Sequence, residues 1–130
     1  MSSSCQSLSK SKTSASTKQL NGVYILTKQK SQTRLVSVGY KDTKIVIDDY
    51  EKTISCFVGC NTIQADFFYE NGKIKPIHYV ATEKACQDYI LDLELDFLDN
   101  LSKANLYTWK EDDLMLYHND ILLMVWHLKE

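Results

Sequence analysis

Arginine is almost absent from this 130-residue chain, because Arg34 is the only one and lysine supplies the other positive charges. Bidentate recognition of phosphate and carboxylate groups usually relies on arginine. Proteins that bind nucleic acid usually carry a marked excess of positive charge, whereas the formal net charge here is −2. The composition therefore argues against nucleic acid as a partner.

Long hydrophobic runs are also missing. The longest apolar run covers residues 121–126, which is the length of a strand, whereas a membrane-spanning helix needs about 20 apolar residues. The first residues lack the apolar core of a signal peptide. Two interpretations remain: a cytoplasmic protein, or an envelope protein from which a leader has been removed.

The first 18 residues are dominated by serine, threonine and lysine and show no hydrophobic periodicity. Such a segment cannot offset the entropy cost of ordering itself, so residues 1–18 are predicted to be a disordered tether, and residues 19–130 a single globular domain. Cys5 follows three serines, an arrangement similar to the end of a bacterial lipobox, whose cysteine is cleaved and acylated. Cys5 is therefore a candidate lipidation site; the alternative is a free thiol in a polar tail.

Short β-branched and aromatic runs separated by polar turns predict strands through most of the domain. A polar turn is expected at residues 28–33. Asn71-Gly72 between two apolar runs predicts a type I′ hairpin turn, and Pro76 predicts a sheet edge or a bulge. The expected strands cover residues 20–27, 34–39, 44–48, 53–58, 62–69, 73–80, 106–109, 114–117 and 121–127.

One segment follows a helical period. Between residues 86 and 104, apolar side chains recur three and four positions apart, which predicts one helix over about 86–104. Leu91, Leu95 and Leu98 widen the apolar face, so we expect this helix to be largely packed against the sheet. The acidic residues are expected to face water, and they are Asp88, Asp92, Glu94, Asp96 and Asp99. The fold class is thus α+β, mainly β: an antiparallel curved sheet or small barrel with one packed helix.

Signatures of catalysis and metal binding are missing from the sequence. There is no Gly-x-Ser-x-Gly elbow and no Cys-x₂-Cys spacing, and His78, His118 and His127 are scattered. The sequence therefore predicts no catalytic residues, no metal and no cofactor. The strand aromatics either fill the core, which is the favoured interpretation, or line a cavity for an apolar ligand.

Several separated segments resemble the META/HslJ family. Leu20 to Tyr24 matches its opening Leu-x-Gly-x-aromatic strand, and Gly59-Cys60-Asn61 matches its most distinctive turn. Thr82, Ala85 and Cys86 match the segment that precedes the family's helix. The resemblance extends from Leu20 to Trp126 in the family's order, with Cys56 replacing a usual glycine and Lys84 a usual apolar residue.

The resemblance implies a β-rich fold with one helix, no known catalytic set, and a setting in bacterial envelopes, often as a lipoprotein with a role in stress tolerance. Cys60 and Cys86 fall in the two family motifs. A disulfide between them would close a loop of about 27 residues, which is worth roughly 3 kcal/mol in the chain-entropy model. The alternative is that both are buried thiols. Cys56 is then either inert or a competitor for Cys86.

The expected function is that of a non-enzymatic envelope protein of the META/HslJ type, located at the outer membrane or in the periplasm. It would be anchored through Cys5 and would act in an accessory or stress-related role by binding an unknown envelope protein. We expect a monomer that touches the membrane only through this anchor. The rival interpretations are a small-barrel carrier of a lipophilic ligand, a cytosolic binding module, and an inhibitor of secreted enzymes.

Overall fold

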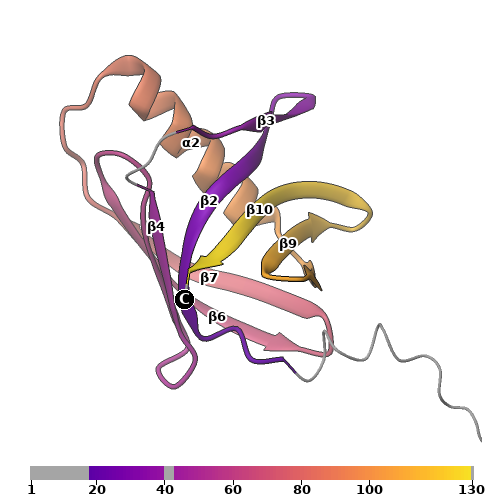
Figure 1. Ribbon diagram of the computed structural model, residues 1–130. Helices are drawn as coiled ribbons and strands as arrows, with labels where there is room; N and C mark the ends of the chain where they lie inside the picture. The colour runs from indigo at the N-terminus through magenta and orange to yellow at the C-terminus, as the bar shows by residue number, and fades with distance from the viewer. Residues whose placement is uncertain (1–17, 40–42, 130) are drawn as a thin grey trace, which may run out of the picture.

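The computed structural model describes residues 18–39 and 43–129 (Figure 1). The expected tether and Cys5 therefore lie outside the described residues, apart from Lys18. The elements follow one another as β2 (Gly22–Ser31), β3 (Arg34–Ser37), β4 (Lys44–Asp48), β5 (Thr53–Phe57), β6 (Thr62–Glu70), β7 (Lys73–Ala81), α2 (Asp88–Lys103), β8 (Leu106–Lys110), β9 (Asp113–His118) and β10 (Ile121–Lys129).

The strands form a closed antiparallel barrel. The sheet runs in the order β10-β9-β8-β7-β6-β5-β4-β2-β3, and an additional pairing of β10 with β2 closes a ring of eight strands. The ninth strand, β3, extends from the ring by pairing with the second half of β2. Closure leaves few open strand edges, which is how small β proteins avoid unpaired backbone groups. The predicted small barrel with one helix is confirmed.

Alternating side chains along the strands fill the barrel interior. The largest of them are aromatic: Tyr24, Phe67, Tyr107 and Trp126 are at most 1% exposed. The Trp126 ring stacks on Phe97 of the helix at a centroid distance of 6.1 Å and meets Tyr24 edge-on at 6.0 Å. These rings occupy the space that a ligand would need inside a barrel of this size, which supports the core interpretation of the strand aromatics.

Two turn predictions have different outcomes. Asn71 and Gly72 have φ angles of 53° and 84°, so both central residues adopt the positive φ that a type I′ turn requires. The turn expected at residues 28–33 is wrong for residues 28–31, because β2 continues through Ser31 and the chain reverses at Gln32, whose φ is 59°. The extra length pairs with β10 on one side and with β3 on the other, and tertiary pairing overrides the polar local sequence.

One seam of the barrel is narrow. β7 meets β8 through a single residue pair, Lys73 with Leu106, supported by hydrogen bonds from Ile74 N to Asn105 O and from Tyr107 N to Gly72 O. Over the rest of its length, β7 pairs on this side with no strand of the described chain. Pro76 lies on this open stretch, and the ladder to β6 shifts register nearby, where His78 has a φ of 58°. The sheet edge and the bulge that Pro76 predicts are therefore both present in β7.

Helix α2 lies across the barrel and closes it with one face (Figure 1). Phe97 and Leu101 enter the core, and the helix is tied to β2 by Asn100, whose Nδ2 donates to Lys30 O at 2.8 Å. The expectation that the leucines of the other stripe pack against the sheet is wrong for Leu91 and Leu95, which are 39% and 57% exposed. No helix among the described residues is long and apolar enough to cross a membrane.

Candidate functional site

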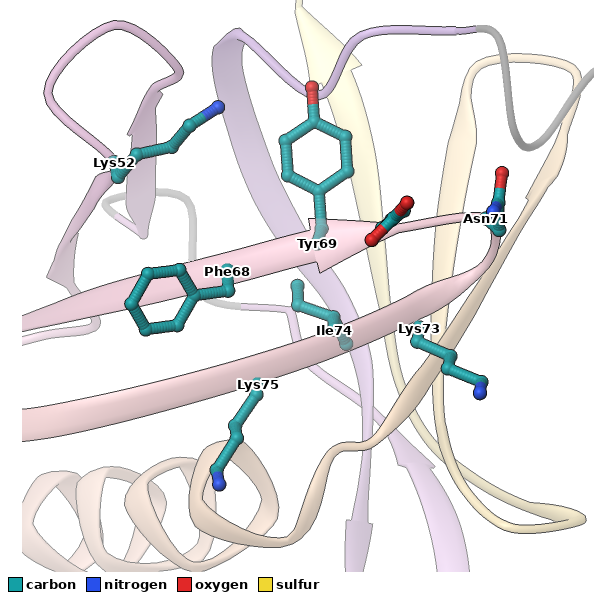
Figure 2. Close-up of a pocket in the computed structure, with 8 residues that line it drawn as sticks. Lys52, Phe68, Tyr69, Asn71, Lys73, Ile74 and Lys75 are labelled. Carbon is teal, nitrogen blue, oxygen red and sulfur yellow. The ribbon is translucent and has the colours of Figure 1, made fainter.

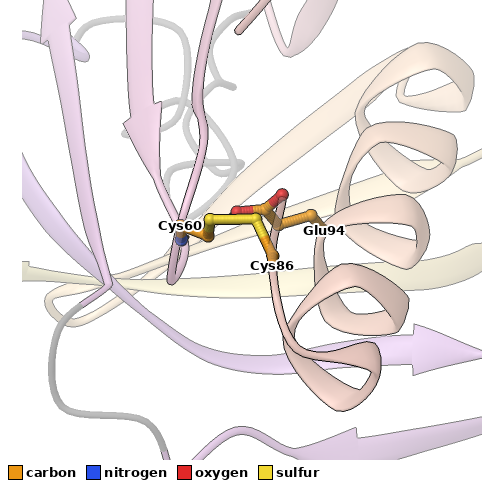
Figure 3. A group of neighbouring side chains, drawn as sticks. All are labelled: Cys60, Cys86 and Glu94. Carbon is orange, nitrogen blue, oxygen red and sulfur yellow. Dashed lines mark hydrogen bonds between the residues drawn. A yellow bond between two sulfur atoms is a disulfide. The ribbon is translucent and has the colours of Figure 1, made fainter. Parts of the chain in front are cut away.

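Three segments that are distant in sequence meet beside the helix. A disulfide between Cys60 and Cys86, whose Cα atoms are 6.2 Å apart, joins the turn after β5 to the segment 82–86. The third segment is α2, which places the carboxylate of Glu94 against this disulfide (Figure 3). The predicted pairing of Cys60 with Cys86 is thus present. Disulfides of this kind are typical of proteins that work outside the reducing cytosol.

Glu94 is the centre of this site. It is only 5% exposed, and its carboxylate accepts three hydrogen bonds. Oε2 accepts from the backbone N–H groups of Cys60 at 2.8 Å and Asn61 at 2.5 Å, and Oε1 accepts from Asn61 Nδ2 at 2.9 Å. A buried carboxylate is stable only when its lone pairs are used in this way.

Asn61 connects Glu94 to the segment before the helix. Its Oδ1 accepts from Thr82 Oγ1 at 2.9 Å and from Lys84 N at 2.8 Å. The amide oxygen and nitrogen are thus fixed by partners of opposite character, so the side chain has one orientation in which all of these bonds are made. We call the five residues Cys60, Asn61, Thr82, Cys86 and Glu94 the Asn61–Glu94 cluster.

The family-motif residues fall mostly in or beside this cluster. Gly59 adopts a φ of 145°, a backbone conformation that L side chains rarely adopt, immediately before Cys60. Ala85 is exposed and makes no part of the cluster itself. The motif therefore serves to dock the turn and the 82–86 segment onto the helix.

Cys56 lies apart from the disulfide. It is a free thiol on β5, 1% exposed and part of the hydrophobic core, and burial raises the pKa of its thiol well above the ordinary value. Of the two alternatives for Cys56, the structure supports the inert one.

The expectation that Glu94 faces water is wrong, because its side chain is buried. Glu94 lies on the same stripe as Ile90, Phe97 and Leu101, spaced four, three and four residues apart. A carboxylate inside an apolar stripe is the signal that identifies a buried acceptor.

The side chains of this site do not suit a metal ion in the oxidised protein. Ligand atoms of Cys60, Cys86 and Glu94 lie within 4.8 Å of one another, but the two sulfurs are bonded to each other and offer no thiolate. The histidines have separate partners: His78 contacts Asp66, His118 contacts Lys103 O, and His127 contacts Asp113.

A groove runs directly over the Asn61–Glu94 cluster. Its first part is a hollow of about 430 Å³ between α2, Ile63 of β6 and the segment 81–85, with Asn61 and Glu94 among its lining residues and Leu91, Leu95 and Leu98 along the helix. A second hollow of about 420 Å³ shares Leu95 and Leu98 and adds Tyr79. We call the two together the α2–β7 groove.

A larger hollow of about 520 Å³ lies elsewhere, on the hairpin of β6 and β7 (Figure 2). Its ammonium groups do not converge, because Lys52 extends towards the side of Tyr69 whereas Lys73 and Lys75 extend towards the opposite side. Tyr69 donates to Asp49 Oδ2 at 2.9 Å, and a hydrogen bond from Lys52 lowers the pKa of Asp49. The polar groups of Lys52, Asp49 and Tyr69 thus already have partners within the protein and are not free to bind a ligand. The α2–β7 groove is therefore the better candidate site.

The comparisons with known proteins agree with the fold. The model of the META domain matches residues 17–128. An NMR structure of a protein from Burkholderia xenovorans is 14% identical, with a TM-score of 0.68 over 84% of this chain and 82% of that chain. A second protein solved by NMR is 15% identical, with a TM-score of 0.61 over 83% of this chain and 89% of its own. No curated protein matches the chain in sequence.

Proposed function

Because this chain belongs to the META domain family, we propose that it is a non-catalytic accessory module that binds a protein partner through the α2–β7 groove. The observation that carries the proposal is the exposure of Leu91 and Leu95 beside a concave surface whose floor is held by a disulfide and a buried carboxylate. A rigid floor lowers the entropy cost of binding, and large exposed apolar side chains grouped at a groove are typical of interaction sites.

The alternative of a lipid carrier has less support. A carrier of this size would hold its ligand inside the barrel, and that space is taken by Tyr24, Phe67, Tyr107 and Trp126. The apolar surface that remains available is outside the barrel, on the helix.

The proposed setting is the bacterial cell envelope. The Cys60–Cys86 disulfide supports an oxidising compartment. In this proposal Cys5 carries an acyl chain, the segment up to Lys18 acts as the tether, and a monomer meets its envelope partner close to the membrane.

Binding is tested with two surface variants of matched character. Leu95 and Phe68 are 57% and 60% exposed, and only Leu95 lies in the α2–β7 groove. Wild type, Leu95→Asp and Phe68→Asp are expressed in the native host, crosslinked and purified. We expect Leu95→Asp to lose a stoichiometric crosslinked partner that wild type and Phe68→Asp retain. Equal crosslinking by all three proteins would contradict the proposed site.

The setting is tested separately. Wild type and Cys5→Ala are labelled with a fatty-acid probe and fractionated. We expect label and membrane association in wild type and neither in Cys5→Ala. An unlabelled wild type in the cytosol would overturn the anchor and leave the cytosolic binding module as the better account.

A further inference from the structure

The open edge of β7 carries backbone groups that face away from the barrel sheet. Thr82 N donates to Thr62 O at 3.1 Å, so residue 82 faces β6. Backbone groups of a strand alternate in direction, and the N–H and C=O of Ala81, and of Tyr79 two residues earlier, therefore point away from β6. This edge pairs with no strand of the described chain.

The side chains at this edge belong to the α2–β7 groove. Ala81 lines its first part and Tyr79 its second, whereas the intervening Val80 points to the other face and is 66% exposed. An added strand beside Tyr79–Ala81 would therefore direct every second side chain towards Leu91, Leu95 and Leu98 of the helix. Backbone acceptors and donors and an apolar wall thus face the same space.

The charged residues that line the groove are more acidic than basic: they are Glu83, Glu94 and Asp99 against one lysine, Lys84. Of the aspartates of α2, Asp99 lines the second hollow and is paired with Lys103 at 3.0 Å, whereas Asp92 lines a separate hollow beside β3. Over its whole length, α2 has five carboxylates and one lysine. The excess of acidic residues in the lining complements a positively charged partner.

We propose that the partner binds by adding a short extended segment, with alternating apolar and basic residues, to the Tyr79–Ala81 edge of β7. Its backbone pairs with Ala81 and Tyr79, and its apolar side chains contact Leu91, Leu95 and Leu98. Its basic side chains lie near the acidic lining residues Glu83 and Asp99. This mode of strand addition rests on the proposed function and names the chemical class of the partner.

The test uses a synthetic probe, the acetylated heptapeptide Lys-Val-Lys-Val-Lys-Val-Lys. Two control peptides isolate the two contributions: one has alternate backbone amides N-methylated, which removes donors, and the other has glutamate in place of lysine. Binding is followed by NMR on the ¹⁵N-labelled protein at low salt. We expect the amide signals of Tyr79 and Ala81 and the methyl signals of the three groove leucines to shift with the first peptide, and affinity to fall at least tenfold with either control.

Two variants at one position separate the backbone contact from folding. Ala81→Pro removes an N–H that faces away from β6, so the β6–β7 ladder stays intact and the thermal midpoint should change little. Ala81→Val keeps the N–H and suits a strand. We expect Ala81→Pro to lose at least tenfold in affinity for the probe and Ala81→Val to bind within about threefold of wild type.

Each outcome decides the proposal. If Ala81→Pro binds the probe as wild type does, or if shifts fall outside the α2–β7 groove, strand addition is wrong. If the native partner is still lost in Leu95→Asp while the probe does not bind, the proposed function stands and strand addition is overturned. A dimer of the protein alone that Ala81→Pro abolishes would assign the edge to a second copy instead.

Discussion

Glu94 and Asn61 offer a direct test of how the cluster is built. In Glu94→Gln, the amide oxygen takes the place of Oε2 and still accepts from the N–H groups of Cys60 and Asn61. The new amide nitrogen then faces Asn61 Nδ2, which is also a donor. Asn61 cannot reverse its amide, because its Oδ1 accepts from Thr82 and Lys84.

The expected loss of stability follows from these contacts. Two charge-assisted bonds become neutral bonds, each weaker by about 1 kcal/mol, and one bond is replaced by two opposed donors at a cost of about 1 kcal/mol or more. Relief from burying a charge offsets part of this sum. We expect Glu94→Gln to lower the free energy of unfolding by about 2 to 4 kcal/mol, which is roughly 8 to 16 °C in the thermal midpoint for a domain of this size.

The partner substitution supplies the control. When Glu94→Gln is combined with Asn61→Asp, the new carboxylate at position 61 accepts from the new amide at position 94 and also from Thr82 and Lys84, so donors and acceptors match again. Asn61→Asp alone places two carboxylates in contact and should destabilise more at pH 7 than at pH 4. We expect the double variant to recover at least half of the loss in Glu94→Gln, a coupling of about 1 to 2 kcal/mol.

Urea unfolding with the disulfide intact measures these differences, because fluorescence of the buried Trp126 reports the core. A loss below about 0.5 kcal/mol in Glu94→Gln would show that the carboxylate is dispensable. A double variant less stable than Glu94→Gln would refute the assignment of donors and acceptors between positions 61 and 94.

Three further results are expected. Replacing Cys60 and Cys86 by serine should lower the free energy of unfolding by about 3 kcal/mol, measured against wild type in the same urea series; a loss below about 1 kcal/mol would mean that the other contacts already hold the segment. Cys56 in folded protein should react with a thiol reagent only at the rate of unfolding, because it is buried and its pKa is raised; rapid labelling of native protein would contradict that burial. The pKa of Asp49 is lowered, so the folded protein favours the charged carboxylate. Its contribution to the free energy of unfolding is therefore present above the pKa of the carboxyl in the unfolded chain, and it is lost as the pH falls through the lower pKa of the folded protein. Asp49→Asn should therefore cost less than about 1 kcal/mol at pH 7 and less still at pH 2, and an equal cost at both pH values would contradict the charge assignment.

The sequence was sufficient for most of the fold because local patterns and tertiary contacts agree. Alternating apolar residues, the Asn71-Gly72 turn and Pro76 each predicted the element in which they lie. The β2 prediction failed at residues 28–31, where a polar stretch becomes a strand because β10 and β3 pair with it from both sides. Such pairing is set by barrel closure, which no local window of sequence contains.

The site was less accessible from sequence for a related reason. Cysteine spacing and motif position made the Cys60–Cys86 bridge one of two open alternatives, and Glu94 was placed in water because acidic residues usually face it. The sequence pattern of α2 predicts one broad buried face, whereas the barrel can cover only the side that carries Phe97 and Leu101. A single helix on a closed barrel has one partner, so a second apolar stripe must remain exposed.

This geometry links the cluster to the groove. Glu94 and Asn61 hold the turn and the 82–86 segment against α2, and the same two residues form part of the groove floor. A partner that binds the groove therefore stabilises the cluster by the same free energy by which an intact cluster strengthens binding. The exposed leucines cost the isolated protein little, since single apolar side chains are common on surfaces. On this face the exposed leucines lie beside an unpaired strand edge, over a floor that is fixed by a disulfide. Phe68 on the β6–β7 hairpin is equally exposed, but it lies beside neither an unpaired edge nor a disulfide.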